Sequence, residues 1–129
     1  MDFTGLDLLF LEINNLTDAV AFYHEQLGFE IETNSPDAEP PMATLRAGRL
    51  RITLVEQLET MLRRGRGCYF FLGVADVDAY YEELKERGVE VAPPVDEGWG
   101  GRFVTVEDPE NKYRFFFVTW TDEKLKEAG

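Results

Sequence analysis

The sequence predicts an α+β fold made of two tandem βαβββ modules, which form curved mixed sheets around a central cup with the helices on the outer faces. The order of one strand, one helix and three strands occurs twice, at an offset of about 60 residues. Each predicted helix follows a capping residue, Asn15 or Asp76, and ends at a glycine, Gly28 or Gly88. Because each half is too small to close a core alone, we expect the two to share one.

The first module is defined by a helical stripe between extended segments. Leu16, Val20, Tyr23 and Leu27 recur at helical spacing, which predicts one amphipathic helix. The flanking segments are rich in apolar and β-branched residues and are separated by turn residues. The expected strands are 6–13, 29–34, 42–47 and 49–56.

The second module repeats this scheme. Val77, Tyr81 and Leu84 form its helical stripe. The expected strands are 69–74, 89–91, 102–108 and 113–120, with a long loop at 93–101. A turn at 108–111 joins the last two strands, and Asn111 is expected to take its left-handed position.

We expect a single domain over residues 1–129, with the repeat as its internal organisation. Module 1 covers 6–56 and module 2 covers 67–120. The segment 57–66 is the linker, and the polar tail is 121–129.

Composition excludes several classes of partner. Twenty-five acidic residues against 13 basic ones give a formal net charge of −12. Nucleic-acid binders need a basic surface, and anionic membranes attract one, so neither partner is expected. No apolar run is long enough to span a membrane and the N-terminus has no basic region, which favours the cytoplasm. The single cysteine, Cys68, excludes an intrachain disulfide and is expected to be a small buried residue.

Strand alternation predicts which side chains face the cup. In 69–74, Phe70 and Leu72 should pack on the helices while Tyr69 and Phe71 point the other way. The same argument assigns Phe116 and Val118 to the core. The predicted cup lining is Leu8, Phe10, Thr53, Val55, Tyr69, Phe71, Phe115 and Phe117.

Three further residues are placed at or over the cup. Arg51 and Glu12 carry charge at cup-facing positions, so they are expected at the rim or paired with each other. Trp99, among glycines, is a candidate to close over the cup or stack on a ligand. An aromatic cup suits a flat or hydrophobic small molecule. The same residues also suit the centre of a sheet system or a dimer interface.

The stretches "INNLTDAVAFYHEQLGFEI", "VADVDAYYEELKERGVEV" and "GWGGRFVTVEDPENKYRFFF", with the repeat, resemble the vicinal oxygen chelate superfamily. This family includes glyoxalase I, extradiol dioxygenases, fosfomycin-resistance enzymes and bleomycin-resistance proteins. The resemblance covers residues 6–120. It implies the paired βαβββ fold and, for the enzymes of the family, a divalent metal held by four side chains from four strands.

Carried over by position, the four metal-ligand sites of the family fall on Leu8, Thr53, Tyr69 and Phe115. Divalent ions of this kind prefer imidazole or carboxylate ligands, which none of the four provides. The sequence is therefore similar to the metal-free, bleomycin-resistance branch, whose members are dimers that sequester an antibiotic.

These observations lead to one hypothesis and two alternatives. The hypothesis is a homodimeric, metal-free protein that binds an antibiotic-like aromatic or cationic small molecule, without cofactor or catalytic residue. Its predicted contacts are the cup-lining residues with Arg51 and Trp99. The first alternative is a metal-dependent glyoxalase, lyase, isomerase or dioxygenase of the same superfamily. The second is a ligand-free structural or interaction module.

Overall fold

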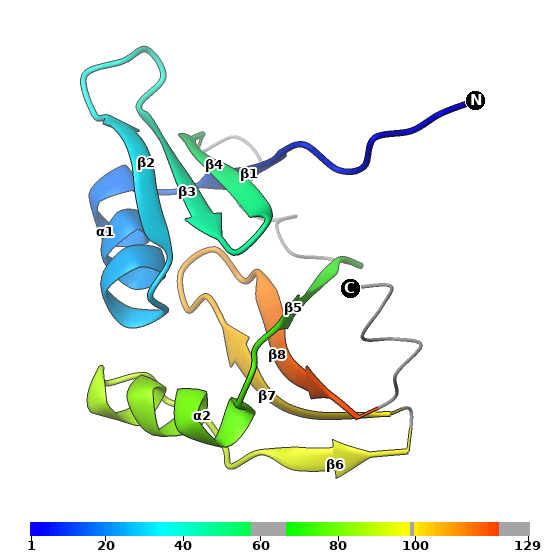
Figure 1. The fold of residues 1–129 in the computed structure, drawn as a ribbon. Coiled ribbons are helices and arrows are strands. Elements are labelled where there is room, and N and C mark those ends of the chain that lie inside the picture. The colour runs from blue at the N-terminus through cyan, green and yellow to red at the C-terminus, as the bar shows by residue number, and fades with distance from the viewer. Residues whose placement is uncertain (58–66, 99, 122–129) are drawn as a thin grey trace. The chain divides into compact units, whose positions relative to one another are not determined.

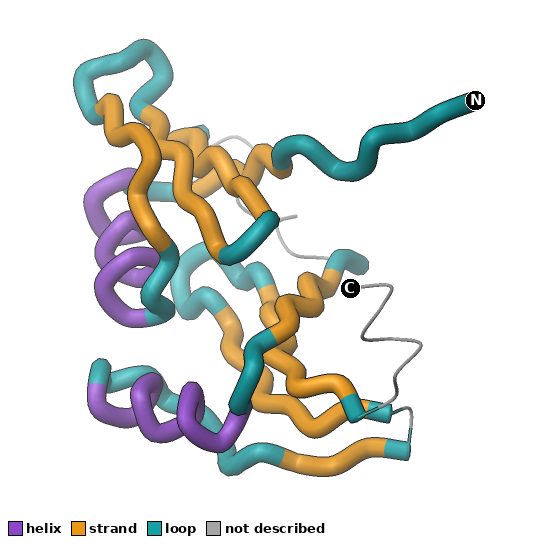
Figure 2. The backbone as a smooth tube through the Cα atoms, viewed as in Figure 1, coloured by secondary structure: helices purple, strands orange, loops and turns teal. Residues whose placement is uncertain are grey.

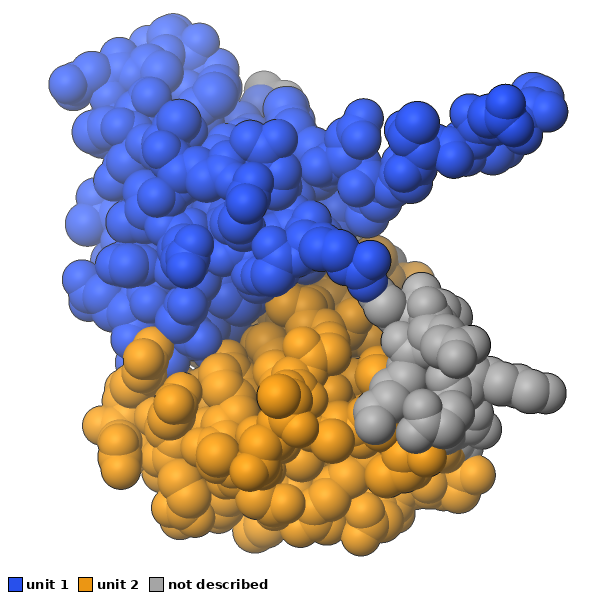
Figure 3. Space-filling view, in the orientation of Figure 1, with its two compact units in different colours: residues 1–64 blue, residues 65–129 orange. Residues whose placement is uncertain are grey.

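The computed structural model describes residues 1–57, 67–98 and 100–121. The chain divides into two compact units, residues 1–64 and 65–129 (Figure 3). The boundary lies within the segment 57–66 that the sequence suggested as a linker. Each unit is described by itself.

Unit 1 contains a four-stranded mixed sheet with its helix against one face (Figure 1). The elements are β1 (Leu9–Ile13), α1 (Leu16–Val20), the π-helical η1 (Ala21–Gln26), β2 (Glu30–Ser35), β3 (Met42–Ala47) and β4 (Leu50–Glu56). The strand order is β1-β4-β3-β2, in which β1 runs parallel to β4 and the other neighbours are antiparallel. This is the predicted βαβββ order.

Unit 2 repeats this topology (Figure 2). Its elements are β5 (Tyr69–Gly73), α2 (Val77–Glu86), β6 (Val95–Glu97), β7 (Gly101–Glu107) and β8 (Arg114–Trp120). The strand order is β5-β8-β7-β6, with β5 parallel to β8. The α+β fold class with two four-stranded mixed sheets and tandem βαβββ units is therefore confirmed, and the central cup stays a prediction.

Both helices begin as the capping residues predict. The Asn15 side chain accepts a hydrogen bond from the Asp18 backbone N–H at 2.9 Å. The Asp76 carboxylate accepts two such bonds, from Asp78 and Ala79, each at 3.1 Å. These bonds satisfy amides that have no partner inside the helix.

A second contact ties each helix start to the last strand of its own unit. In unit 1 the Leu16 backbone N–H donates to Glu56 Oε2 at 3.1 Å. In unit 2 the Val77 N–H donates to Thr119 Oγ1 at 2.9 Å, and the Thr119 hydroxyl donates to the Val74 carbonyl, also at 2.9 Å. The two units therefore use different side chains, Glu56 and Thr119, to bind the first backbone N–H of the helix to the last strand.

The apolar core of each unit lies between the helix and the facing side of its sheet. Unit 1 buries mainly aliphatic side chains there, namely Leu11, Ile13, Leu16, Leu45, Ile52 and Leu54, with Tyr23 from the helix. Unit 2 buries Val77 and Leu84 of the helix against Val104, Val106, Phe115 and Phe117. The helix-facing side of each sheet is thus the packed side.

Three local expectations were wrong. No strand forms at 89–91, because the edge strand of unit 2 is Val95–Glu97, where Val95 lies in register with Phe103. Cys68 is exposed, because it precedes the first paired residue of an edge strand. The left-handed residue of the last turn is Lys112, with φ of 68°, since Asn111 is buried and bonds the Asp108 carboxylate.

No helix in the described part of the chain combines the length and apolar character needed to cross a bilayer.

Candidate functional site

The side of the unit 2 sheet that faces away from α2 carries a cluster of aromatic residues. In the parallel pair β5–β8, Tyr69 lies beside Arg114 and Phe71 beside Phe116. Side chains alternate along each strand, so these residues share one face with Trp120 and, on β7, with Phe103. We call this set, Tyr69, Phe71, Phe103, Phe116 and Trp120, the aromatic face.

Ring contacts join all five members of the aromatic face. Phe116 is at the centre, with its ring centroid 4.6 Å from Phe71 at an interplanar angle of 9°. It also lies 5.8 Å from Tyr69 and 5.4 Å from Phe103. Phe71 in turn lies 6.4 Å from Trp120 at 21°. Phe116, Phe71 and Trp120 are therefore similarly tilted, whereas Tyr69 and Phe103 meet the Phe116 ring at 76° and 56°.

Two of these rings remain substantially open to solvent. Tyr69 is 56% exposed and Phe71 49%. Gly73 continues the row next to Phe71, and a Cβ there would lie 3.8 Å from Trp120 Nε1, so the glycine leaves the indole close to the backbone. Exposed aromatic area of this extent is typical of interaction and ligand sites.

A polar edge borders the aromatic face. Arg114 and Glu107 lie opposite each other on β8 and β7, with Arg114 Nη2 3.5 Å from Glu107 Oε1. The Arg114 guanidinium carbon lies 5.5 Å from the centroid of the Tyr69 ring, a cation–π arrangement.

The corresponding face of unit 1 is mostly polar. The Glu32 carboxylate meets Arg46 Nε at 2.7 Å and Arg51 Nη2 at 2.6 Å. The hydrogen bond from Arg51, followed by the nearby charge of both arginines, lowers the pKa of Glu32 from its ordinary value. Further along β3 and β4, the hydroxyl groups of Thr44 and Thr53 form a hydrogen bond of 2.8 Å.

The predicted residues of unit 1 lie on this polar face. Phe10 is in register with Thr53, and Val55 continues the same side of β4. Leu8 and Phe10 are exposed, whereas Thr53 is buried with its hydroxyl bonded to Thr44. Arg51 pairs with Glu32 of β2, whereas Glu12 lies in register with Val55, further along β4.

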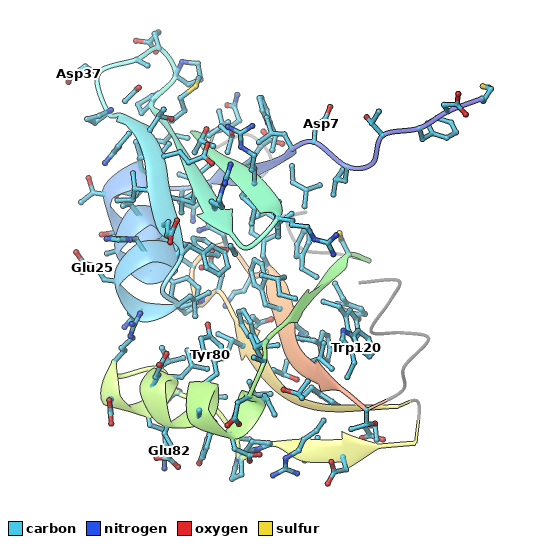
Figure 4. The ribbon with its side chains drawn as sticks, viewed as in Figure 1. Asp7, Glu25, Asp37, Tyr80, Glu82 and Trp120 are labelled. Atoms are coloured by element: carbon cyan, nitrogen blue, oxygen red, sulfur yellow. The ribbon has the colours of Figure 1, made fainter. Side chains whose placement is uncertain are left out.

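In unit 2 the predicted faces are right for β5 and wrong for β8. Tyr69 and Phe71 point away from the helix, as expected. Phe115 and Phe117 are 0% and 1% exposed and lie on the helix side, where Phe117 packs 4.8 Å from Tyr80 of α2. Figure 4 shows Tyr80 and Trp120 on opposite sides of β8. The physical reason is register: Phe115 pairs with Phe70 and Phe117 with Leu72, both of which face the helix.

Phe116, Phe103 and Trp120 were therefore missed as members of the site. Val118, assigned to the core, is buried but takes the same side of β8 as Phe116. The charge of Arg114 was the available signal, because a charged residue marks the solvent side of a strand and Phe116 shares its parity. Trp99 lies outside the described residues.

Comparison with known proteins places this geometry in a family. The sequence matches the family model of the Glyoxalase/Bleomycin resistance protein/Dioxygenase superfamily over residues 5–115. The chain belongs to this superfamily. No curated protein matches the sequence.

Solved structures of superfamily members are similar along most of the chain. TnmS3, an antibiotic binding protein from Streptomyces sp. CB03234, is 25% identical with a TM-score of 0.76, over 93% of this chain and 98% of that one. A glyoxalase/bleomycin resistance protein from the same organism is 26% identical, with a TM-score of 0.69 over 87% and 97%. The fosfomycin resistance protein FosX from Listeria monocytogenes, at 22% identity and a TM-score of 0.75 over 95% and 98%, shows the shared fold.

The residues of this superfamily member do not fit the divalent metal of its enzymes. The positions that the family resemblance assigns to metal ligands carry Leu8, Thr53 and Tyr69, and the last strand offers Phe115 or, on the helix-free side, Arg114 and Phe116. None supplies imidazole or carboxylate, and the Arg114 cation repels a metal ion. Across residues 1–57, 67–98 and 100–121, no three His, Cys, Asp or Glu side chains gather into a possible metal site.

Proposed function

We propose that this chain is a metal-free binding protein for a planar aromatic, antibiotic-like small molecule, acting as a cytoplasmic homodimer. The observation that carries this proposal is the aromatic face of unit 2. Phe71, which is nearly parallel to Phe116 and Trp120 and about half exposed, offers stacking surface to a flat ligand, and the exposed Tyr69 ring stands beside it. Antibiotic binding by TnmS3, which is similar over almost its whole length, supports this ligand class.

The proposal assigns no catalytic reaction to the protein. Aromatic rings and hydroxyls at the family's ligand positions can position a molecule but cannot polarise a carbonyl as a metal would. The unit 1 residues Leu8, Phe10, Arg51, Thr53 and Val55, together with Trp99, stay proposed contacts. For β8 the proposal replaces Phe115 and Phe117 with Phe116.

A double variant tests the aromatic face. Phe71→Ala with Phe116→Ala removes the central stacked pair, whereas Phe3→Ala removes an exposed phenylalanine that contacts none of these rings. We expect naphthalene-2-carboxamide to bind the wild type in an NMR titration. The double variant should bind it at least about tenfold more weakly, since one lost stacking contact is worth roughly 1–3 kcal/mol.

Equal binding by the double variant and by Phe3→Ala would contradict the proposal. Native mass spectrometry of freshly purified protein gives a second test, in which we expect a bound aromatic molecule on a dimer. Stoichiometric metal in the purified protein, lost together with activity on treatment with a chelator, would instead support the metal-dependent alternative.

A further inference from the structure

Arg114 is the one cation that the described residues of unit 2 place on the helix-free side of the sheet. Lys85 belongs to α2 and Arg87 caps its C-terminal end, and Lys112 lies in the last turn, where its Nζ donates to the Pro109 carbonyl. Arg102 takes the opposite side of β7 and contacts Asp78 of the helix. Within residues 67–98 and 100–121, the aromatic face therefore has one positive group, at its edge.

The guanidinium of Arg114 makes weaker contacts with carboxylates than those of Arg102 and Arg51. Arg102 makes three hydrogen bonds to carboxylate oxygens at 2.8–3.1 Å, and Arg51 makes two to Glu32. Arg114 approaches Glu107 only to 3.5 Å, beyond the usual range for a charge-assisted hydrogen bond. Its side chain is 43% exposed, so its N–H donors are accessible to a ligand.

The Tyr69 ring links Arg114 to the centre of the aromatic face. The Tyr69 ring lies 5.5 Å from its guanidinium carbon, and Tyr69 contacts Phe116 at the centre of the aromatic face. A flat ligand stacked on Phe71 and Phe116 would thus have its edge near the planar donor group of Arg114. A guanidinium recognises carboxylate in a bidentate, coplanar geometry.

Resting on the function proposed above, we propose that the ligand of the aromatic face is a planar aromatic acid whose ring-edge carboxylate binds Arg114. The net charge of −12 opposes the approach of an anion at long range, but at physiological salt that field decays over about 8 Å. Contact with Arg114 is direct and is screened much less. The ligand carboxylate replaces the loose contact with Glu107 by shorter hydrogen bonds.

Three probes of one shape test the charge preference. They are 2-naphthoate, neutral naphthalene-2-carboxamide and the cation 2-naphthylmethylammonium, each titrated into the full-length protein and followed by NMR. We expect 2-naphthoate to bind most tightly. Arg114→Gln should weaken it about tenfold, as loss of a charge-assisted hydrogen bond predicts, and change the carboxamide by less than about twofold.

Matched variants separate local contact from net charge. Arg87→Gln removes the same charge from the C-terminal end of α2 and should leave 2-naphthoate binding within about twofold. Arg114→Lys keeps the charge without the planar fork, and intermediate affinity is expected. Glu107→Gln removes the competing carboxylate and should strengthen 2-naphthoate binding.

The outcomes distinguish the two proposals. Preference for the ammonium probe, or equal loss in Arg114→Gln and Arg87→Gln, would overturn the carboxylate inference while leaving an aromatic-binding protein. Failure of all three probes to bind the wild type would overturn both. Loss of all three in Phe71→Ala/Phe116→Ala, with selective loss of 2-naphthoate in Arg114→Gln, would support both.

Discussion

The two units have the same topology and different chemistry on their helix-free faces. In unit 1 that face carries the Glu32 ion pairs and the Thr44–Thr53 hydrogen bond. In unit 2 the equivalent strands carry the aromatic face, with Phe116 in contact with three other rings. The helix-facing sides are apolar in both units.

This difference shows which positions the fold constrains. The helix-facing side must fill the space under the helix, so apolar residues are required there in both halves. The helix-free side has no such requirement, and its residues can differ according to what they bind. On its own helix-free face, unit 2 presents aromatic rings and unit 1 presents ion pairs and hydroxyl groups.

The largest effect is expected when the helix-facing and helix-free sides of the sheet are compared through two neighbouring residues on β8. Phe115→Ala removes a fully buried ring and should lower the free energy of unfolding by about 3–5 kcal/mol. Phe116→Ala, on the opposite side, should cost less than about 2 kcal/mol because its ring is partly solvated. Denaturant unfolding measures both, and equal costs would remove the distinction between the two faces.

A smaller effect is expected from the helix caps. Asp76 accepts two backbone N–H groups and Asn15 accepts one, so Asp76→Ala should destabilise more than Asn15→Ala. Each cost should lie near 1 kcal/mol, within the range for lost N-caps. Thermal unfolding gives the order, and Asp76→Asn, which keeps an acceptor, serves as the control. The reverse order would contradict the explanation that the cost follows the number of backbone N–H groups that each cap accepts.

The smallest effect is expected from the exposed ion pairs, whose contribution to the stability of the fold depends on pH. Hydrogen bonding from Arg102, then its charge, lowers the pKa of Asp78, as Arg51 does for Glu32. A carboxyl with a lowered pKa stabilises the fold above its ordinary pKa, here 3.8 for Asp78 and 4.5 for Glu32, and the contribution disappears as pH falls below it.

Arg102→Gln should therefore lower stability slightly at neutral pH and match the wild type in strong acid. Arg51→Gln should show less, because Arg46 still contacts Glu32. Unfolding curves measured from pH 7 down to about pH 2 check this. A difference that grows toward low pH would contradict the assignment.

The fold could be predicted from sequence because the signals were redundant. The caps Asn15 and Asp76, the glycines that end the helices and the repeated order all indicated the same topology. In β4, polar and apolar residues alternate through Arg51, Ile52, Thr53 and Leu54, so the two sides were unambiguous.

The aromatic face could be predicted only in part, because residues 115–117 are three consecutive phenylalanines. Such a run gives no alternation, and a shift of one residue exchanges the two sides. The register with β5 decides the matter, and register depends on contacts between segments more than 40 residues apart in the chain. The position of Arg114 beside Tyr69, on which the proposed ligand contact depends, also follows only from this register.

The hydrogen bonds that the Leu16 N–H donates to Glu56 and the Val77 N–H donates to Thr119 join residues 40 and 42 positions apart. A local helix turn therefore reaches its final stability only when the last strand of its unit has taken its place beside the first. In each unit the helix and the pairing of the last strand are therefore expected to form together. Folding of either half is expected to be all-or-none, with little helix surviving once the final strand is lost.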